Sequence, residues 1–208
     1  VTAVNDAPVA RGEVASFNED NAITFTQAQL LANDSDADTA TDGQVLTVTA
    51  VTGAQNGTVT LLVNSDGSGD VRFTPDANYH GPARFSYTVS DGAGGTAEAT
   101  VNLTVLPVND TPVAQGESFD ATEDTTLAIA ASTLLANDSD ADTATDGQIL
   151  SISAVDGATH GTVVLVTLPD GSQQVNYTPD ANHHGPAQFR YTVSDGAGGT
   201  ATAVATLN

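Results

Sequence analysis

The stretch LLANDSDADTATDGQ at residues 30–44, repeated unchanged at 134–148, gathers the side chains best suited to chemistry. It places Asp34, Asp36 and Asp38 at alternating positions, and Asp42 follows. Two carboxylates about 4 Å apart repel each other by roughly 1–4 kcal/mol at the dielectric of a protein surface. A hard divalent cation with about six to eight oxygen ligands converts that repulsion into coordination. The stretch therefore predicts calcium binding, with a solvated acidic loop as the alternative.

The alternating spacing is shared with the start of an EF-hand loop. The sixth position, however, is Thr39 instead of glycine, and the twelfth is Val45 instead of the bidentate glutamate. The sequence also predicts no helices on either side of the loop. The pattern therefore argues against an EF-hand, and the excess of charge needs another explanation.

The composition excludes several classes of function. The chain has 26 acidic residues against four basic ones, for a net charge of −22. Such a field repels nucleic acids and anionic membranes, so we expect no nucleic-acid partner. No stretch approaches the roughly 18 apolar residues of a membrane span, so we expect no membrane insertion. The absence of cysteine is typical of a cytosolic protein, or of one secreted without oxidative folding.

The whole chain is an internal duplication. VNDAPVARGE at 4–13 returns as VNDTPVAQGE at 108–117, and the long stretch at 73–97 returns at 177–201, always 104 residues later. Roughly 60% of the paired positions are identical, which indicates tandem copies of one domain. We predict domains at 1–106 and 107–208, joined end to end by a short linker that two prolines stiffen. The chain then reads as a piece of a longer array.

Strand signals dominate each copy. Phe85, Tyr87 and Val89 alternate with polar residues, and turn signals such as Asp91-Gly92 separate runs of this kind. About seven short strands per hundred residues predict an all-β fold, a Greek-key β-sandwich of the immunoglobulin-like kind in each copy. Residues 26–31 could form one helical turn. Tyr87 falls on the inward face of its strand and is predicted to belong to the core.

Further acidic positions repeat at the same offset, near predicted strand ends. They are Glu19-Asp20 and Glu123-Asp124, Asp76 and Asp180, and Asp91 and Asp195, together with the Asn-Asp pairs that open each copy. This order, with the phrases VNDAP, LLANDSDAD, FTPDANYHG and FSYTVSDGAGG, resembles a cadherin repeat. In particular, it resembles the bacterial cadherin-like tandem repeats of large RTX-type surface adhesins, over nearly the whole chain.

The resemblance implies calcium at the joint between successive repeats. Matched by position, the implied Ca²⁺ ligands are Glu19 and Asp76 from the first repeat, Asn109 and Asp110 from the linker, and Asp195 with two of Asp138, Asp140 and Asp142 from the second. Equivalent half-sites would consist of Asn5, Asp6, Asp34, Asp36, Asp38 and Asp91 at one end, and Glu123 and Asp180 at the other. No acid precedes Val108 as it does in animal cadherins, so we expect about one or two ions per joint rather than three.

Other chemistries find less support. His80 and His184 recur before Gly-Pro, but the copies differ at Tyr79 and His183, which favours loop histidines over a zinc site. No Gly-x-Ser-x-Gly turn or phosphate-binding loop is present, so we expect no enzyme. Sugars usually require an aromatic platform, and the chain has no Trp.

We therefore predict calcium-binding extender repeats of a secreted bacterial adhesin, acting at the cell surface or in biofilm as a monomeric rod. The partners would be neighbouring repeats of the same long chain. A calcium-dependent module for extracellular polysaccharide or matrix is the first alternative. Homophilic cell–cell adhesion is the second, and it ranks lower because the exchanged strand of animal cadherins is anchored by Trp.

Overall fold

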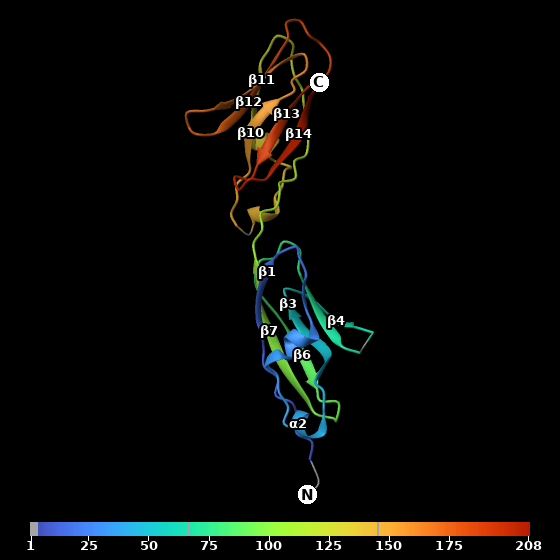
Figure 1. Cartoon of the computed structure of the whole chain (residues 1–208). Coiled ribbons are helices and arrows are strands. Elements are labelled where there is room, and N and C mark those ends of the chain that lie inside the picture. The colour runs from blue at the N-terminus through green and yellow to red at the C-terminus, as the bar shows by residue number, and fades with distance from the viewer. Residues whose placement is uncertain (1–3, 66, 145) are drawn as a thin grey trace. The chain divides into compact units, whose positions relative to one another are not determined.

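The computed structural model describes residues 4–65, 67–144 and 146–208 and divides the chain into two compact units. Repeat 1 is Val1–Val108 and repeat 2 is Asn109–Asn208. Residues 1–3 of the predicted first domain lie outside the described residues. Each repeat is a β-sandwich of two sheets, which confirms the predicted all-β fold (Figure 1).

Repeat 1 packs a four-stranded sheet, ordered β1-β7-β6-β3, against a three-stranded sheet, ordered β2-β5-β4. All neighbours are antiparallel except β1 and β7, which run parallel from the Val14–Asn102 pair onward. The strands are β1 (Val14–Asn18), β2 (Ile23–Phe25), β3 (Thr47–Gln55), β4 (Gly57–Val63), β5 (Gly69–Pro75), β6 (Gly81–Ser90) and β7 (Thr96–Leu106).

Repeat 2 repeats this topology in its sheets β10-β13-β14-β8 and β11-β12-β9, with β8 parallel to β14. The strands are β8 (Ser118–Phe119), β9 (Leu127–Ala130), β10 (Ser151–Asp156), β11 (Gly161–Thr167), β12 (Gln173–Pro179), β13 (Ala187–Ser194) and β14 (Thr200–Leu207). Because the first and last strands of a repeat pair in one sheet, the segment that enters the repeat lies beside the end of that sheet.

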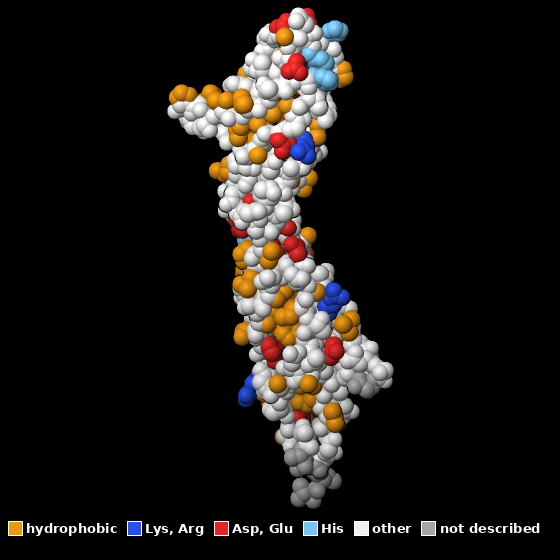
Figure 2. Space-filling model, turned by 45° about the horizontal axis from the view of Figure 1, so that its top comes forward, with side chains coloured by type: hydrophobic (Ala, Val, Ile, Leu, Met, Phe, Trp, Pro, Cys, Tyr) orange, Lys and Arg blue, Asp and Glu red, His pale blue; other side chains and the backbone are white. Residues whose placement is uncertain are grey.

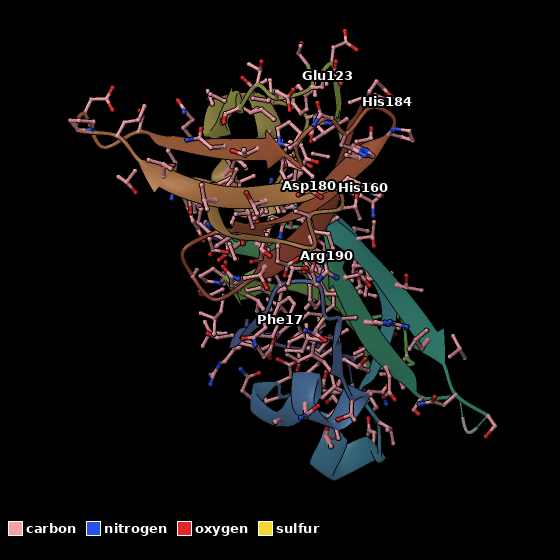
Figure 3. All side chains as sticks on the ribbon, turned by 90° about the horizontal axis from the view of Figure 1, so that it is seen from above. Phe17, Glu123, His160, Asp180, His184 and Arg190 are labelled. Carbon is pink, nitrogen blue, oxygen red and sulfur yellow. The ribbon has the colours of Figure 1, made fainter. Side chains whose placement is uncertain are left out.

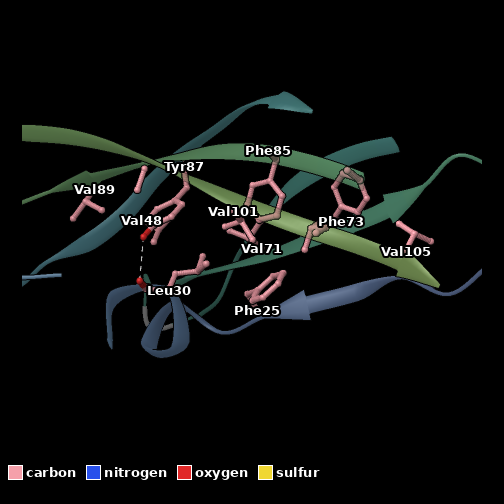
Figure 4. Close-up of a cluster of buried hydrophobic side chains, with 13 residues drawn as sticks. Phe25, Leu30, Val48, Val71, Phe73, Phe85, Tyr87, Val89, Val101 and Val105 are labelled. Atoms are coloured by element: carbon pink, nitrogen blue, oxygen red, sulfur yellow. Dashed lines mark hydrogen bonds between the residues drawn. The ribbon is translucent and has the colours of Figure 1, made fainter. Parts of the chain in front are cut away.

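The core of each repeat follows the period-two pattern of its strands. In β6, Phe85, Tyr87 and Val89 are fully buried, as predicted, while the residues between them face outward or are half-buried. Phe85 stacks on Phe73 with ring centroids 6.0 Å apart, and Phe25 packs against Phe85 at 5.9 Å. Figure 4 shows this cluster between the two sheets, with Leu30 closing it from the side.

One helical turn forms where residues 26–31 predicted it. In repeat 1, α1 (Gln27–Leu30) starts at Thr26, whose side chain caps Gln29 N while the Gln29 side chain caps Thr26 N. The other short helices are η1 (Leu31–Asn33), α2 (Thr39–Asp42), α3 (Ala131–Leu134) and η2 (Ala141–Thr143). In the described parts of the chain, none of the helices is long and apolar enough to cross a membrane.

Candidate metal centre

The Asn-Asp pair that opens repeat 2 is held by the aspartates predicted as ligands. Asn109 Nδ2 donates to Asp195 Oδ2 at 2.8 Å, and Asp110 N donates to Asp142 Oδ2 at 2.8 Å. Gln148 Nε2 donates to Asn109 Oδ1 at 2.7 Å, which ties the end of the acidic loop to the same place. We call the set of Asn109, Asp110, Asp140, Asp142, Gln148 and Asp195 the linker cluster.

Repeat 1 builds the same cluster from its equivalent residues. Asn5 Nδ2 donates to Asp91 Oδ2 at 2.9 Å, Asp6 N to Asp38 Oδ2 at 2.7 Å, and Gln44 Nε2 to Asn5 Oδ1 at 2.6 Å. Each distance lies within 0.1 Å of its counterpart in repeat 2. The arrangement is therefore a property of the repeat, assembled within one unit.

The alternating spacing of the acidic loop sets which aspartate meets the linker. Asp140 Oδ1 accepts from Asp142 N at 2.8 Å, and this local turn directs Asp142 inward until it is 2% exposed. Asp195 is 3% exposed and accepts from the backbone N–H groups of Ala197, Gly198 and Gly199. The hydrogen bond from Asn109, reinforced by these backbone donors, lowers the pKa of Asp195 below its ordinary value.

The linker cluster contains oxygen atoms that are buried yet accept no hydrogen bond. In repeat 2 these are Asp140 Oδ2 and Gln148 Oε1, and in repeat 1 they are Asp36 Oδ2 and Gln44 Oε1. A buried acceptor without a donor is costly in a folded protein. A hard cation would satisfy carboxylate and amide oxygens together, so the donor set fits calcium. Among the described residues, no group of three or more acidic or histidine side chains already converges on one point.

The first aspartate of each triplet lies in a different place from the other two. Asp138 Oδ1 accepts from Gln115 N at 2.7 Å, and Asp34 Oδ1 accepts from Arg11 N at 2.7 Å. Asp34 Oδ2 is also 3.3 Å from the hydroxyl of Tyr87. Asp34 and Asp138 therefore hold the segment that precedes the first strand of each repeat. These contacts do not place the two aspartates at the linker.

The hydroxyl of Tyr87 faces more acceptors than its one proton can serve. Besides Asp34, it lies 2.9 Å from Arg11 O, 3.1 Å from Glu13 Oε1 and 3.1 Å from Leu30 O. Burial, with a smaller contribution from the charge of Asp34, raises the pKa of the Glu13 carboxyl to about 7. In repeat 2, burial likewise raises the pKa of Glu117 and of Asp138 beside Tyr191. A proton is therefore held at this group of acids more readily than in the unfolded chain.

At the opposite end of repeat 1, Glu19 is the most buried acid, only 1% exposed. Its Oε1 accepts from Val108 N at 2.7 Å, and its Oε2 has no hydrogen-bond partner, with His80 Nδ1 3.8 Å away. Asp76 lies in the exposed loop after β5. Glu19 therefore presents a buried, unsatisfied carboxylate oxygen beside the segment that leaves repeat 1.

The equivalent acids of repeat 2, Glu123 and Asp180, are both exposed. His183 and His184 lie in the loop of Asp180, and His160 precedes β11; Figure 3 labels His160 and His184. His160 stacks on His183 with ring centroids 4.1 Å apart and planes 10° apart. His183 N donates to Asp180 O at 3.0 Å. Parallel stacked rings do not direct their nitrogen lone pairs to one point, so this geometry does not favour a zinc site.

Two kinds of residue in these clusters were not predicted from the sequence. Gln44 and Gln148 carry no charge, and their only signal is that they end the repeated fifteen-residue stretch. Glu13 and Glu117 sit beside the predicted core tyrosines, and their signal was the repeated Gly-Glu after the Asn-Asp segment. Both kinds are recognised only once the loops are folded together.

Comparisons with known proteins divide the chain at the linker, where the structure also divides it into two units. Residues 4–106 match the family described as a cadherin-like domain, and residues 109–208 match the family described as a bacterial Ig domain. None of the curated protein sequences matches the chain.

Solved structures with similarity to this chain include two kinds of protein. A human CDH23 fragment, EC21-23, is 17% identical over 95% of this chain and 67% of its own, with a TM-score of 0.49. The human desmocollin-1 ectodomain is 10% identical over 98% of this chain and 40% of its own, with a TM-score of 0.46. An endo-fucoidan hydrolase of glycoside hydrolase family 107 is 20% identical over 97% of this chain, with a TM-score of 0.40, and this chain spans 28% of its length.

Proposed function

Because the chain is a tandem pair of bacterial cadherin-like repeats, we propose that it is a calcium-binding extender segment of a secreted, RTX-type bacterial adhesin. Domains of these families are typically non-enzymatic and suggest an extracellular or surface protein that makes repeat–repeat or homophilic contacts. The proposal assigns this segment the task of spacing and stiffening a longer array in adhesion or biofilm.

The observation that carries the proposal is the pair of unsatisfied buried oxygens in each linker cluster. Asp140 Oδ2 and Gln148 Oε1 are buried beside further carboxylates, and the corresponding atoms recur in repeat 1. A Ca²⁺ ion would balance the negative charge of the carboxylates and would be bound by both oxygens that lack donors. Within the cluster, Asp142 and Asp195 are the aspartates that hold the linker in place.

That Glu19 and Asp76 of repeat 1 add ligands to the calcium site of repeat 2 stays a prediction. Glu19 Oε2 is buried and without a hydrogen bond next to the exit of repeat 1, which supports Glu19 as a further ligand. Asp76 is exposed and is proposed as a further ligand from repeat 1. Removing the Glu19 charge with Glu19→Gln should weaken calcium binding of repeat 2 without changing that of repeat 1.

The first experiment measures calcium stoichiometry by isothermal titration after dialysis against EDTA. Extracellular modules bind calcium near 10⁻⁴–10⁻³ M, so we expect uptake in roughly this range. Asp142→Asn should abolish the uptake at the cluster of repeat 2, because an amide still accepts from Asp110 N but brings no charge. Asp38→Asn should do the same in repeat 1.

Asp170→Asn is the matched control, since Asp170 is an exposed turn residue that caps Ser172 and an Asn can do the same. Its stoichiometry should equal that of the wild type. Absence of uptake at millimolar calcium, or equal uptake by Asp142→Asn and the wild type, would contradict the proposal.

The stiffening role has its own measurement. Repulsion within a chain of charge −22 should leave the two repeats more mobile without calcium. Small-angle scattering should therefore show a wider distribution of particle dimensions in EDTA than in calcium. Identical curves would refute stiffening while leaving calcium binding intact.

A further inference from the structure

Repeat 2 has a long sheet edge without the features that usually prevent one sheet from pairing with another. Strand β11 has seven residues, contains neither charge nor proline, and ends its sheet, so only one of its sides is paired. Its register with β12 runs without a bulge from Gly161–Pro179 to Thr167–Gln173. Figure 1 shows the β11–β12 hairpin projecting from the rest of repeat 2, and Figure 2 shows hydrophobic side chains gathered along it. A regular apolar edge of this kind is a template for another strand.

The other sheet edges are short or irregular. The edge strands β3 and β10 are interrupted by bulges, which lie between Ile152 and Ala154 in β10 and at two places in β3. The strands β2, β8 and β9 have only two to four residues each. Strand β1 has five residues and is flanked by Glu13 and Glu19. Among the edge strands of the described residues, only β4, the equivalent of β11 in repeat 1, is equally regular over seven residues.

The two regular edges differ in the charges that lie behind them. In repeat 1 the neighbours of β4 on the outer face of the sheet include Asp70 and Arg72 of β5. In repeat 2 the same positions hold Gln174 and Asn176 of β12, which are neutral and bond to each other at 2.6 Å. The β11–β12 hairpin carries one charge, Asp170 at its tip, although the chain has 26 acids. The edge of repeat 2 is therefore the one that a second chain of the same charge can approach most closely.

The register of the hairpin shows which backbone groups of β11 are unpaired. Leu168 N donates to Ser172 O near the tip, and Asp180 N donates to His160 O at the base. Hydrogen-bonded pairs alternate along an antiparallel ladder, so the even-numbered residues of β11 bond to β12. The odd-numbered residues therefore direct their N–H and C=O groups to the free edge. Within the described parts of the chain, no other segment forms a backbone hydrogen bond with them.

We propose that β11 pairs with β11 of a second copy of this chain, antiparallel and across a two-fold axis at Val164. This register places Gly161 opposite Thr167 and Val163 opposite Leu165, so every odd-numbered residue finds a partner, with about eight hydrogen bonds in total. On the outer face the two Val164 side chains meet, and β-branched side chains lie opposite each other on both sides of them. The pairing is a homophilic contact and goes beyond the extender function, which needs only one chain.

This register also keeps the charges of the two copies apart. The two hairpin tips point in opposite directions, so the two Asp170 carboxylates are on the order of 30 Å apart, several screening lengths at physiological salt. Each tip comes toward the base of the other hairpin, where Arg190 bonds to Asp156 at 2.7 Å in a pair without net charge. The repulsion that remains is the long-range one between two chains of charge −22, and added salt weakens it.

The first test is a crosslink in the two-repeat chain in EDTA, since the pairing involves no residue of the linker cluster. Because the chain has no cysteine, Val164→Cys introduces a single thiol. The Cα atoms of a pair that is not hydrogen-bonded lie about 4.5 Å apart in an antiparallel ladder, within the range of a disulfide. Oxidation with diamide should therefore give a covalent dimer on a non-reducing gel. Thr60→Cys, at the equivalent position of β4, is the matched control and should stay mostly monomeric.

Sedimentation equilibrium measures the association without a crosslink. The wild-type dimer should become tighter as NaCl rises from about 0.15 M to about 0.5 M. Val164→Lys places two ammonium groups opposite each other and should weaken the dimer at least about tenfold, although it lowers the net negative charge. Val164 is 53% exposed, so this substitution leaves the core intact. Thr60→Lys makes the equivalent substitution in repeat 1 and should not weaken the dimer.

Three results would overturn the proposal. The first is a wild-type chain that stays monomeric at about 1 mM in 0.5 M NaCl, which is also the result expected if only a strand of another protein covers this edge. The second is a Val164→Lys variant that dimerises as tightly as the wild type. The third is a Thr60→Cys variant that crosslinks as fast as Val164→Cys, since this would mean that the disulfide reports random collision.

Discussion

The two repeats agree closely at one region and diverge at another. At the linker cluster, three hydrogen bonds recur with lengths that differ by 0.1 Å. At the helical turn beside the hairpin, repeat 1 has a capping box at Thr26 and a bound Gln27 side chain, whereas repeat 2 has Ala130 and Ala131 there, without a side-chain cap. The two copies thus share the hydrogen bonds of the linker cluster, whereas the contacts of Thr26 and Gln27 are absent from repeat 2.

The difference follows from what each set of contacts must balance. The linker cluster concentrates charge, and the buried Asp142 and Asp195 each accept a hydrogen bond from the linker, so loss of that partner leaves a buried charge less well compensated. The contacts of Gln27 are neutral, and in repeat 2 a different side chain, Gln173, bonds to the equivalent strand by donating to Ile152 O at 3.0 Å. Charge therefore constrains the first region more strongly than hydrogen bonding constrains the second.

The largest expected effect concerns the hydrophobic core, which each repeat builds from equivalent residues of its own. Phe85→Ala and Phe189→Ala should each lower the free energy of unfolding of their own repeat by about 3–5 kcal/mol. Phe85 also packs on Phe25, whose equivalent in repeat 2 is Ile129, so the loss should be slightly larger in repeat 1. Urea unfolding followed by NMR signals of each repeat measures both values.

Each substitution should leave the other repeat unchanged, because the two hydrophobic clusters contain no common residue. If Phe85→Ala also destabilised repeat 2 by several kcal/mol, the repeats could not be compared as independent copies.

A smaller effect concerns pH and the carboxyl of Glu13. Folding raises its pKa from 4.5 to about 7, so the folded repeat binds this proton more tightly than the unfolded chain. The resulting stability is fully present below about pH 4.5 and is lost as pH rises toward 7. Glu13→Gln should remove this dependence and stabilise repeat 1 at pH 8 by on the order of 1 kcal/mol, since the group is partly solvated.

Unfolding of both repeats at pH 5 and pH 8 checks this result, with Glu117→Gln as the counterpart in repeat 2. The pKa of Glu117 is raised by burial too, so the change should have the same sign. Below pH 4 the trend reverses, because Asp91 and Asp195 have lowered pKa values and lose stabilising hydrogen bonds when protonated. A wild-type repeat 1 that is equally stable at pH 5 and pH 8 would show that Glu13 is not proton-linked to folding.

Much of this architecture follows from the sequence because it rests on local periodicity. Alternation in residues 85–89 placed Phe85 and Tyr87 in the core, and the constant offset placed the duplication. The roles within the acidic triplet did not follow, because Asp138 turns toward Tyr191 and Asp142 toward Asp110 through contacts between distant loops.

The smallest expected effect concerns an ion pair that only repeat 2 has the residues to form. Arg190 Nε lies 2.7 Å from Asp156 Oδ1, and the equivalent residues in repeat 1 are Ser86 and Thr52. The two side chains are 58% and 60% exposed, so the pair should stabilise repeat 2 by only about 0.2–1 kcal/mol. Asp156→Thr removes the charge and restores a residue that favours strands, which offsets part of that loss.

The salt concentration separates the two effects of Asp156→Thr, namely the loss of the ion pair and the gain in strand preference. At about 1 M NaCl the screening length falls to roughly 3 Å, so the ion pair should contribute little, whereas the strand preference of threonine is unaffected. The stability difference between wild type and Asp156→Thr in repeat 2 should therefore shift in favour of the variant as salt rises. The double substitution Thr52→Asp with Ser86→Arg should give repeat 1 the salt dependence that repeat 2 loses. A difference that does not vary with salt would mean that the pair adds no electrostatic stability, and that the divergence of the repeats at this position lies in strand preference alone.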